Sequence, residues 1–96
     1  MLIVAGHLQV AADQRSTYLD LVQRVTEMSR RAPGCLDFVQ APDPLEPDRI
    51  VVYERWESEE DLLAFRRSDP GGGPLDLPEV LGADVARYEV AGVGPP

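Results

Sequence analysis

Hydrophobic and polar positions alternate with two different periods along this chain, and each period predicts one kind of element. Segments rich in β-branched and aliphatic residues, typical of strands, lie at residues 2–10, 35–41, 49–57 and 85–90. Between them, apolar residues recur every three or four positions, as in an amphipathic helix, over residues 14–32 and 59–67. The predicted order is therefore strand, helix, strand, strand, helix, strand.

Capping and breaking residues set the expected helix ends. Asp13 is suited to cap the first helix, and Pro33 with Gly34 is expected to stop it. Ser58 precedes the second helix, and Asp61 follows three positions later, which is the spacing of a capping pair. The second helix therefore has the better defined start.

The chain has 96 residues, about the length of one small domain, and we expect residues 1–96 to fold as a single unit. A glycine-rich loop at 68–74 has the most flexible composition and is expected to act as a mobile lid. One helical turn is expected at 78–81. The tail at 92–96 is expected to be flexible.

This element order predicts an α+β fold of the ferredoxin-like, split βαβ kind (βαββαβ). Its four strands would form one antiparallel sheet with both helices on the same face. The third strand is apolar on both of its sides, with Ile50, Val52 and Trp56 on one and Val51 and Tyr53 on the other. A strand facing water would be polar on one side. We therefore expect the helix-free face to pack against a second copy in a homodimer.

Acidic residues outnumber basic ones by 17 to 9, which gives a formal net charge of −8. This charge repels phosphate groups and argues against nucleic acid or an anionic membrane as a partner. All nine basic residues are arginine, so Schiff-base chemistry through lysine is excluded. The single cysteine, Cys35, cannot form an internal disulfide, and the sequence shows neither an export signal nor a membrane-spanning run. We expect a cytoplasmic protein.

Two segments carry a resemblance to a known family. They are RRAPGCLDF at residues 30–38 and VYERWES at residues 52–58, the latter followed by an acidic, leucine-rich helix start. Over nearly its whole length the chain resembles the antibiotic biosynthesis monooxygenase (ABM) domain. The resemblance implies a ferredoxin-like domain that forms a dimeric α/β barrel. Similar proteins include cofactor-independent monooxygenases that oxidise phenolic polyketides to quinones, haem-degrading enzymes and quinol oxygenases, so the fold alone does not select a reaction.

The resemblance suggests roles for a few residues. Trp56 matches a tryptophan that lines the pocket between sheet and helices in oxygenase members, although a core aromatic is an equal alternative. His7 occupies a first-strand position where haem-degrading members place an asparagine, and it is the candidate base; the alternative is a hydrogen-bonded structural residue. Family members often carry a histidine where this chain has Phe65 and Arg66, which argues against haem ligation. One histidine alone cannot build a metal site.

Three further residues are candidates for contacting a substrate. Tyr53 can donate a phenolic hydrogen bond, although strand aromatics more often pack. Arg87 can meet the charge of a phenolate or form an ion pair, and Phe65 can line the pocket beside Trp56. Glu54 and Glu57 lie on opposite sides of a strand and do not form a paired-carboxylate site.

The leading hypothesis is a homodimeric, cofactor-independent monooxygenase acting on a small aromatic or polyketide-like phenol or quinol with molecular oxygen. His7 and Trp56 would be catalytic, and Trp56, Tyr53, Phe65 and Arg87 would bind the substrate, with no metal. One alternative is a non-catalytic, ligand-binding dimer. Another is an isomerase with His7 or Glu54 as the proton shuttle. Convergence of His7, Trp56 and a polar partner on one cavity would distinguish these hypotheses.

Overall fold

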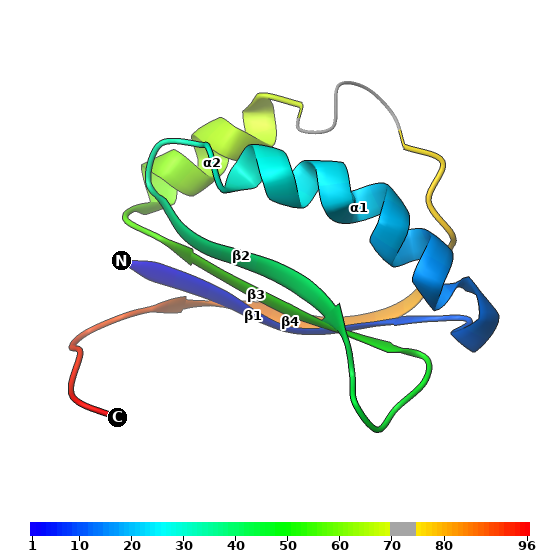
Figure 1. Ribbon diagram of the computed structural model, residues 1–96. Helices are drawn as coiled ribbons and strands as arrows, with labels where there is room; N and C mark the ends of the chain where they lie inside the picture. The colour runs from blue at the N-terminus through cyan, green and yellow to red at the C-terminus, as the bar shows by residue number, and fades with distance from the viewer. Residues whose placement is uncertain (70–74) are drawn as a thin grey trace.

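The computed structural model describes residues 1–69 and 75–96 and has one four-stranded antiparallel sheet with two helices on one face (Figure 1). The strands follow the spatial order β2-β3-β1-β4. The predicted α+β, ferredoxin-like fold is thereby confirmed. In chain order the elements are β1 (Leu2–Val10), a 3-10 helix (Ala12–Gln14), α1 (Arg15–Ser29), β2 (Cys35–Pro42), β3 (Arg49–Trp56), α2 (Glu59–Arg67) and β4 (Val80–Glu89).

Strand pairing decides which side chains face the helices. In an antiparallel sheet, residues directly opposite each other point to the same side. Val4 on β1 is buried in the core and lies opposite Glu54 on β3, so Glu54 faces the helices as well. Ala5, the next residue along β1, lies opposite Tyr53, and these two residues point to the helix-free side.

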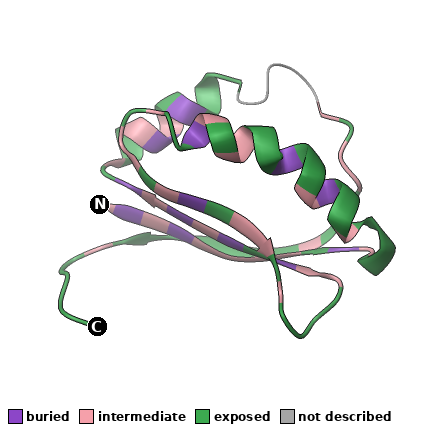
Figure 2. Cartoon of the chain, viewed as in Figure 1, coloured by how far each residue is buried: buried purple, intermediate pink, exposed green. Residues whose placement is uncertain are grey.

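The core lies between the sheet and the two helices, where the buried residues of Figure 2 gather. It has two parts. The part beside α2 contains Leu2, Val4, Phe38, Trp56, Leu62 and Phe65. The part beside the first half of α1 contains Val10, Tyr18, Val22 and Ile50.

Strand β4 is the least covered element. All of its residues except Gly82 are exposed. Its C-terminal end is held by a hydrogen bond from the Val90 amide to the Met1 carbonyl at 3.0 Å. The sheet therefore has one bare edge strand on which neither face is covered within a single chain.

The cap of α2 is confirmed. The Asp61 amide donates to Ser58 Oγ at 3.1 Å, which satisfies one of the free amides of the first turn. The predicted cap of the first helix is wrong, because Asp13 lies within the 3-10 helix and α1 has no side-chain cap. That helix also ends at Ser29 rather than at the predicted Ala32, and residues 30–32 form a turn instead of helix.

The last strand begins earlier than predicted. It starts at Val80, which pairs with Val10 across an irregularity in β1, so the helical turn predicted at 78–81 is wrong. The lid predicted at 68–74 falls mainly on residues 70–74, which lie outside the described residues. No helix among the described residues combines the length and the apolar character needed to cross a bilayer.

A bulge at the start of β2 changes the side on which one residue lies. Cys35 pairs with Trp56 and Asp37 pairs with Arg55, so Leu36 is an extra residue between them. Simple alternation along β2 would place Cys35 and Asp37 on the same side of the sheet, but the bulge places them on opposite sides. Cys35 packs against the core beside α2, whereas Leu36 is 40% exposed.

Candidate functional site

The clearest chemical feature of the molecule is a buried acid beside the tryptophan. Glu54 and Trp56 are two residues apart on β3, so both face the helices. Trp56 Nε1 donates a hydrogen bond to Glu54 Oε1 at 3.0 Å. Trp56 is fully buried, and Glu54 is 9% exposed. Among the described residues, Glu54 is the one buried carboxylate.

The surroundings of Glu54 disfavour its charged form. Val4 on β1 and Phe38 on β2 lie opposite it in the two neighbouring strands. Burial among these apolar groups raises the pKa of the Glu54 carboxyl, while the hydrogen bond from Trp56 and the positive charge of Arg66 lower it to a smaller extent. The resulting pKa lies above its ordinary value of 4.5. Such a carboxyl can both accept and return a proton closer to neutral pH.

Aromatic rings from α2 and β2 lie close to the Glu54–Trp56 pair. Phe65 projects from α2, and its ring lies 5.3 Å from that of Trp56 and 6.2 Å from that of Phe38, nearly edge-on in the second case. The contact between the two rings joins β3 to α2, so the position of the indole depends on the position of α2. The sequence predicted both residues as pocket-lining, and the structure places them in contact.

A small apolar cavity leads toward this cluster. It lies between the end of α1 and α2, has a volume of about 140 Å³ and reaches Phe65. Ala32, Pro33 and Ala64 form its apolar wall, and Asp61 is one of its polar residues. Ligand sites usually measure about 300 Å³ or more, so Phe65 would have to move for a ligand to reach Trp56.

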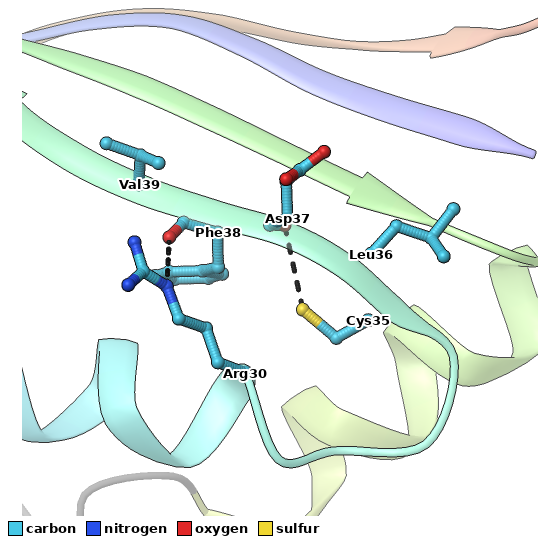
Figure 3. Close-up of a pocket in the computed structure, with 6 residues that line it drawn as sticks. All are labelled: Arg30, Cys35, Leu36, Asp37, Phe38 and Val39. Atoms are coloured by element: carbon cyan, nitrogen blue, oxygen red, sulfur yellow. Dashed lines mark hydrogen bonds between the residues drawn. The ribbon is translucent and has the colours of Figure 1, made fainter.

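A second cavity opens at the start of β2 (Figure 3) and has a volume of about 250 Å³. Arg30 Nε donates to the Phe38 carbonyl at 3.0 Å, and the Cys35 thiol donates to the Asp37 carbonyl at 3.6 Å. Burial, and then the negative charges of Glu54 and Asp37, raise the pKa of the Cys35 thiol. The thiol therefore stays protonated at neutral pH and is a poor nucleophile.

His7 and Tyr53 are not part of the buried cluster. His7 lies opposite Val51 on β3 and Asp84 on β4, on the helix-free side of the sheet. There it lines a polar cavity of about 280 Å³ together with Gln9, Glu46, Asp48 and Arg49. Tyr53 lies on the same side. The structure thus separates His7 from Trp56 by the thickness of the sheet.

Arg87 is on the same side of the sheet as the buried cluster, but it forms an ion pair at the surface. It pairs with Val4 across β1 and β4, so it is on the helix side, where its guanidinium contacts Glu59 of α2 at 3.4 Å. Both side chains are about half exposed, so this ion pair contributes little to stability. The ion-pair alternative for Arg87 is the one that the structure contains.

The described residues contain no cluster of three or more His, Cys, Asp or Glu side chains that could hold a metal ion. Haem fits this cluster poorly, because the chain's one histidine lies on the other face of the sheet and Phe65 occupies the inner side of α2. Sequence reasoning underestimated Glu54. Its position between Val52 and Trp56 in a strictly alternating strand was the available signal, but the hydrogen bond to Trp56 depends on side-chain geometry.

Comparisons with known proteins agree with the fold. The sequence model of the antibiotic biosynthesis monooxygenase (ABM) family matches residues 1–70. The uncharacterized protein sll1783 from Synechocystis sp. is 30% identical over 57 residues, which are 59% of this chain and 39% of that protein. The match therefore spans less than two thirds of the length of that curated relative.

Solved structures are similar over nearly the entire chain. A candidate antibiotic biosynthesis monooxygenase from Chloroflexus aurantiacus J-10-fl has a TM-score of 0.72 and 26% identity, covering 97% of this chain and 96% of its own. The heme-degrader MhuD from Mycobacterium tuberculosis, solved with two hemes in its active site, has a TM-score of 0.71 and 21% identity, covering 98% and 100%. At that identity, the similarity to MhuD establishes a shared fold.

Proposed function

The chain belongs to the antibiotic biosynthesis monooxygenase family, and from this premise we propose that it is a homodimeric monooxygenase acting on a small aromatic phenol or quinol. The proposed oxidant is molecular oxygen, with no bound cofactor. For a phenol, one oxygen atom enters the ring and the other leaves as water, so that phenol and O₂ give quinone and water. The ring supplies the electrons for this reaction.

The single observation that carries the proposal is the buried Glu54 carboxyl beside the Trp56 indole. A phenol must lose its proton before its ring becomes reducing enough to react with oxygen. A carboxylate whose pKa is raised by burial is a stronger base than one in water, and the apolar surroundings keep competing water away. In this proposal Glu54 accepts the phenol proton, and Trp56 holds the carboxylate in place through its N–H.

The other candidate residues take different positions in this proposal. Phe65 closes the route from the cavity between α1 and α2, and it moves aside to admit the substrate. Arg87 leaves Glu59 to meet the phenolate charge, which the modest 3.4 Å ion pair permits. His7 and Tyr53 lie on the helix-free side, and they contribute to subunit contacts rather than to chemistry.

The helix-free face supports the proposed homodimer. Along with Tyr53, this face carries Val39 and Val51, each 38% exposed, and Tyr88, which is 55% exposed. Apolar side chains from β2, β3 and β4 would be covered if two such faces packed together around a two-fold axis. The free Cys35 is compatible with the reducing cytoplasm that we propose as the location.

Two other functions have support from particular observations. An isomerase needs only a proton shuttle, and the raised pKa of Glu54 suits that role without oxygen. A non-catalytic binding protein is favoured by the complete burial of Trp56, which leaves the indole closed to solvent.

An oxygen-uptake screen with simple phenols and quinols tests the proposal. We expect wild-type protein to consume oxygen with at least one of them, and Glu54→Gln to lose that activity while still binding the substrate. Glu57→Gln is the matched control, because Glu57 directly follows the same strand and is exposed. With ¹⁸O₂, one labelled oxygen should appear in the product. Substrate rearrangement without oxygen uptake would establish the isomerase instead, and binding without turnover would establish the non-catalytic function.

A further inference from the structure

A groove between α1 and β2 contains a buried hydrogen-bond acceptor that has no donor. Gln40 lies opposite Val52, so it faces the helices, and its Oε1 atom is buried without a hydrogen-bond partner among the described residues. Leaving such an acceptor unpaired destabilises the folded state, because the oxygen loses its hydrogen bonds to water without a replacement. Most buried acceptors in folded proteins do have partners, so this exception calls for a physical explanation.

The groove next to Gln40 has the size and lining of a small-ligand site. Its volume is about 310 Å³, which is within the range of known ligand pockets. Leu19, Val22, Ala41 and Pro42 provide an apolar surface, and Asp20, Gln23 and Thr26 provide polar groups. The one charged side chain in this lining is the carboxylate of Asp20.

The chemistry of the groove selects a donor-rich, cationic ligand. Gln40 Oε1 can accept hydrogen bonds but cannot donate them, and the same is true of the carboxylate of an ionised Asp20. An ammonium group has three donors and no acceptor, so it complements both. The net charge of −8 further favours a cation over an anion. We propose that this groove binds a small primary amine with an apolar body, whose ammonium group contacts Asp20 and, once the Gln40 side chain turns into the groove, Gln40 Oε1.

This site is separate from the Glu54 cluster and does not depend on the proposed oxygenase activity. Gln40 is two residues beyond Phe38 on the same side of β2, and none of the residues that line the groove belongs to the cluster of Glu54, Trp56 and Phe65. Failure of the oxygen-uptake screen would therefore leave the amine site untouched. Failure of amine binding would likewise leave the oxygenase proposal in place.

2-Phenylethylamine is a suitable probe, because it joins an ammonium group to an aromatic body and carries no phenol that the proposed oxygenase site would bind. We expect saturable amide shifts in ¹⁵N-labelled protein along α1 from Leu19 to Thr26 and in β2 near Gln40, at roughly 0.15 M salt to limit non-specific attraction. The neutral analogue 2-phenylethanol, which has a hydroxyl group in place of the amine, should bind at least about tenfold more weakly. Equal binding of the two compounds would overturn the proposal, as would shifts confined to another part of the protein.

Three variants locate the contacts. Gln40→Leu and Asp20→Asn should each weaken 2-phenylethylamine binding by about tenfold or more, which corresponds to the loss of one good polar contact. Glu27→Gln is the control, because Glu27 is an exposed acid on the same helix that does not line the groove, and its loss changes the net charge equally. Affinity that falls equally in Asp20→Asn and Glu27→Gln would reduce the effect to net charge and overturn the site.

Stability gives an independent measurement on the free protein. Gln40→Leu should raise the midpoint of thermal unfolding by several degrees, because it removes a buried acceptor that has no donor until a ligand binds. 2-Phenylethylamine should raise the midpoint of the wild type but not that of Gln40→Leu. A lower midpoint for Gln40→Leu would mean that Oε1 already has a partner in the free protein, and the acceptor would then not be available to a ligand.

Discussion

The indole N–H of Trp56 donates to the carboxylate of Glu54 at 3.0 Å, and both side chains are enclosed between the sheet and α2. Burial disfavours the charged form of the Glu54 carboxyl, and the hydrogen bond from Trp56 partly compensates by stabilising that form. Its position on one strand, two residues apart, makes it insensitive to small movements between elements. The same pair therefore determines both pH-dependent stability and the proposed chemistry.

The first prediction is that Glu54→Gln removes a pH dependence of stability. The folded-state pKa of Glu54 is raised above 4.5, so the folded chain holds this proton more tightly than the unfolded chain. Its contribution to stability is fully present below pH 4.5 and is lost as pH rises through the folded-state pKa. Urea unfolding across this window should show a free energy of unfolding that declines less steeply in Glu54→Gln than in the wild type. Identical slopes would contradict the prediction.

Asp43 provides a control of opposite sign. The backbone amides of Glu46 and Leu45 donate to its carboxylate and lower the pKa of Asp43 below 3.8. Its contribution is present above pH 3.8 and is lost as pH falls through the lowered pKa. Asp43→Asn should therefore lower stability above pH 3.8 and flatten the pH dependence only in acid, whereas Glu54→Gln changes the slope above pH 4.5.

The second prediction concerns the hydrogen bond itself. Trp56→Phe keeps most of the ring volume but removes the N–H, so the free energy of unfolding should fall by about 1–3 kcal/mol. Trp56→Ala also leaves a cavity and should cost about 3–5 kcal/mol. In Trp56→Phe the pKa of Glu54 should rise further, because the hydrogen bond that lowers it is gone. A ¹³C titration of the Glu54 carboxyl measures this shift. An unchanged pKa would mean that the bond is not formed in solution.

Much of the fold could be predicted from the sequence because local signals agreed with the final arrangement. The capped start of α2 at Ser58 and the strict alternation of β3 define their elements without help from tertiary contacts. The bulge at Leu36 could not be predicted, because it depends on how β2 pairs with β3. The early start of β4 at Val80 has the same cause, since it follows from pairing with Val10.

The candidate site was only partly predictable. Trp56 and Phe65 were named in advance, and they are in contact. His7 lies on the same side of β1 as Ile3 and Ala5, but β1 is apolar on both of its sides, so its sequence could not tell which side faces the helices. The burial of Leu2 and Val4 against α2 resolves this ambiguity.

The third prediction tests a close approach between β1 and β4. Gly6 has φ of 151°, and a Cβ atom there would lie 1.9 Å from the Asp84 carbonyl oxygen. Gly6→Ala should therefore destabilise the fold by more than about 2 kcal/mol. Gly82→Ala is the matched control on β4, because the nearest atom to its Cβ would be the flexible Gln9 Oε1 at 3.4 Å. Denaturant unfolding of both variants measures the difference. Equal stability would show that the two strands separate easily at Gly6.

The fourth prediction tests the proposed homodimer. Val51 is 38% exposed on the helix-free face of β3, between strands that carry other apolar residues. A stable dimer through this face should bury on the order of 2,000 Å² in total, and a charge at its centre would be desolvated without a partner. Val51→Asp should therefore convert a dimer into monomers at micromolar concentration, as measured by sedimentation.

Leu45→Asp is the control for this experiment, because Leu45 is 87% exposed in the loop between β2 and β3 and the change adds the same charge. It should leave the dimer intact. A wild-type protein that sediments as a folded monomer at micromolar concentration would rule out the homodimer. If both variants dissociate, the added negative charge on a chain that already carries −8 is the cause, and the interface lies elsewhere. Dissociation of Val51→Asp alone would locate the subunit contact on the face that carries His7 and Tyr53, which is the position the proposed function assigns to them.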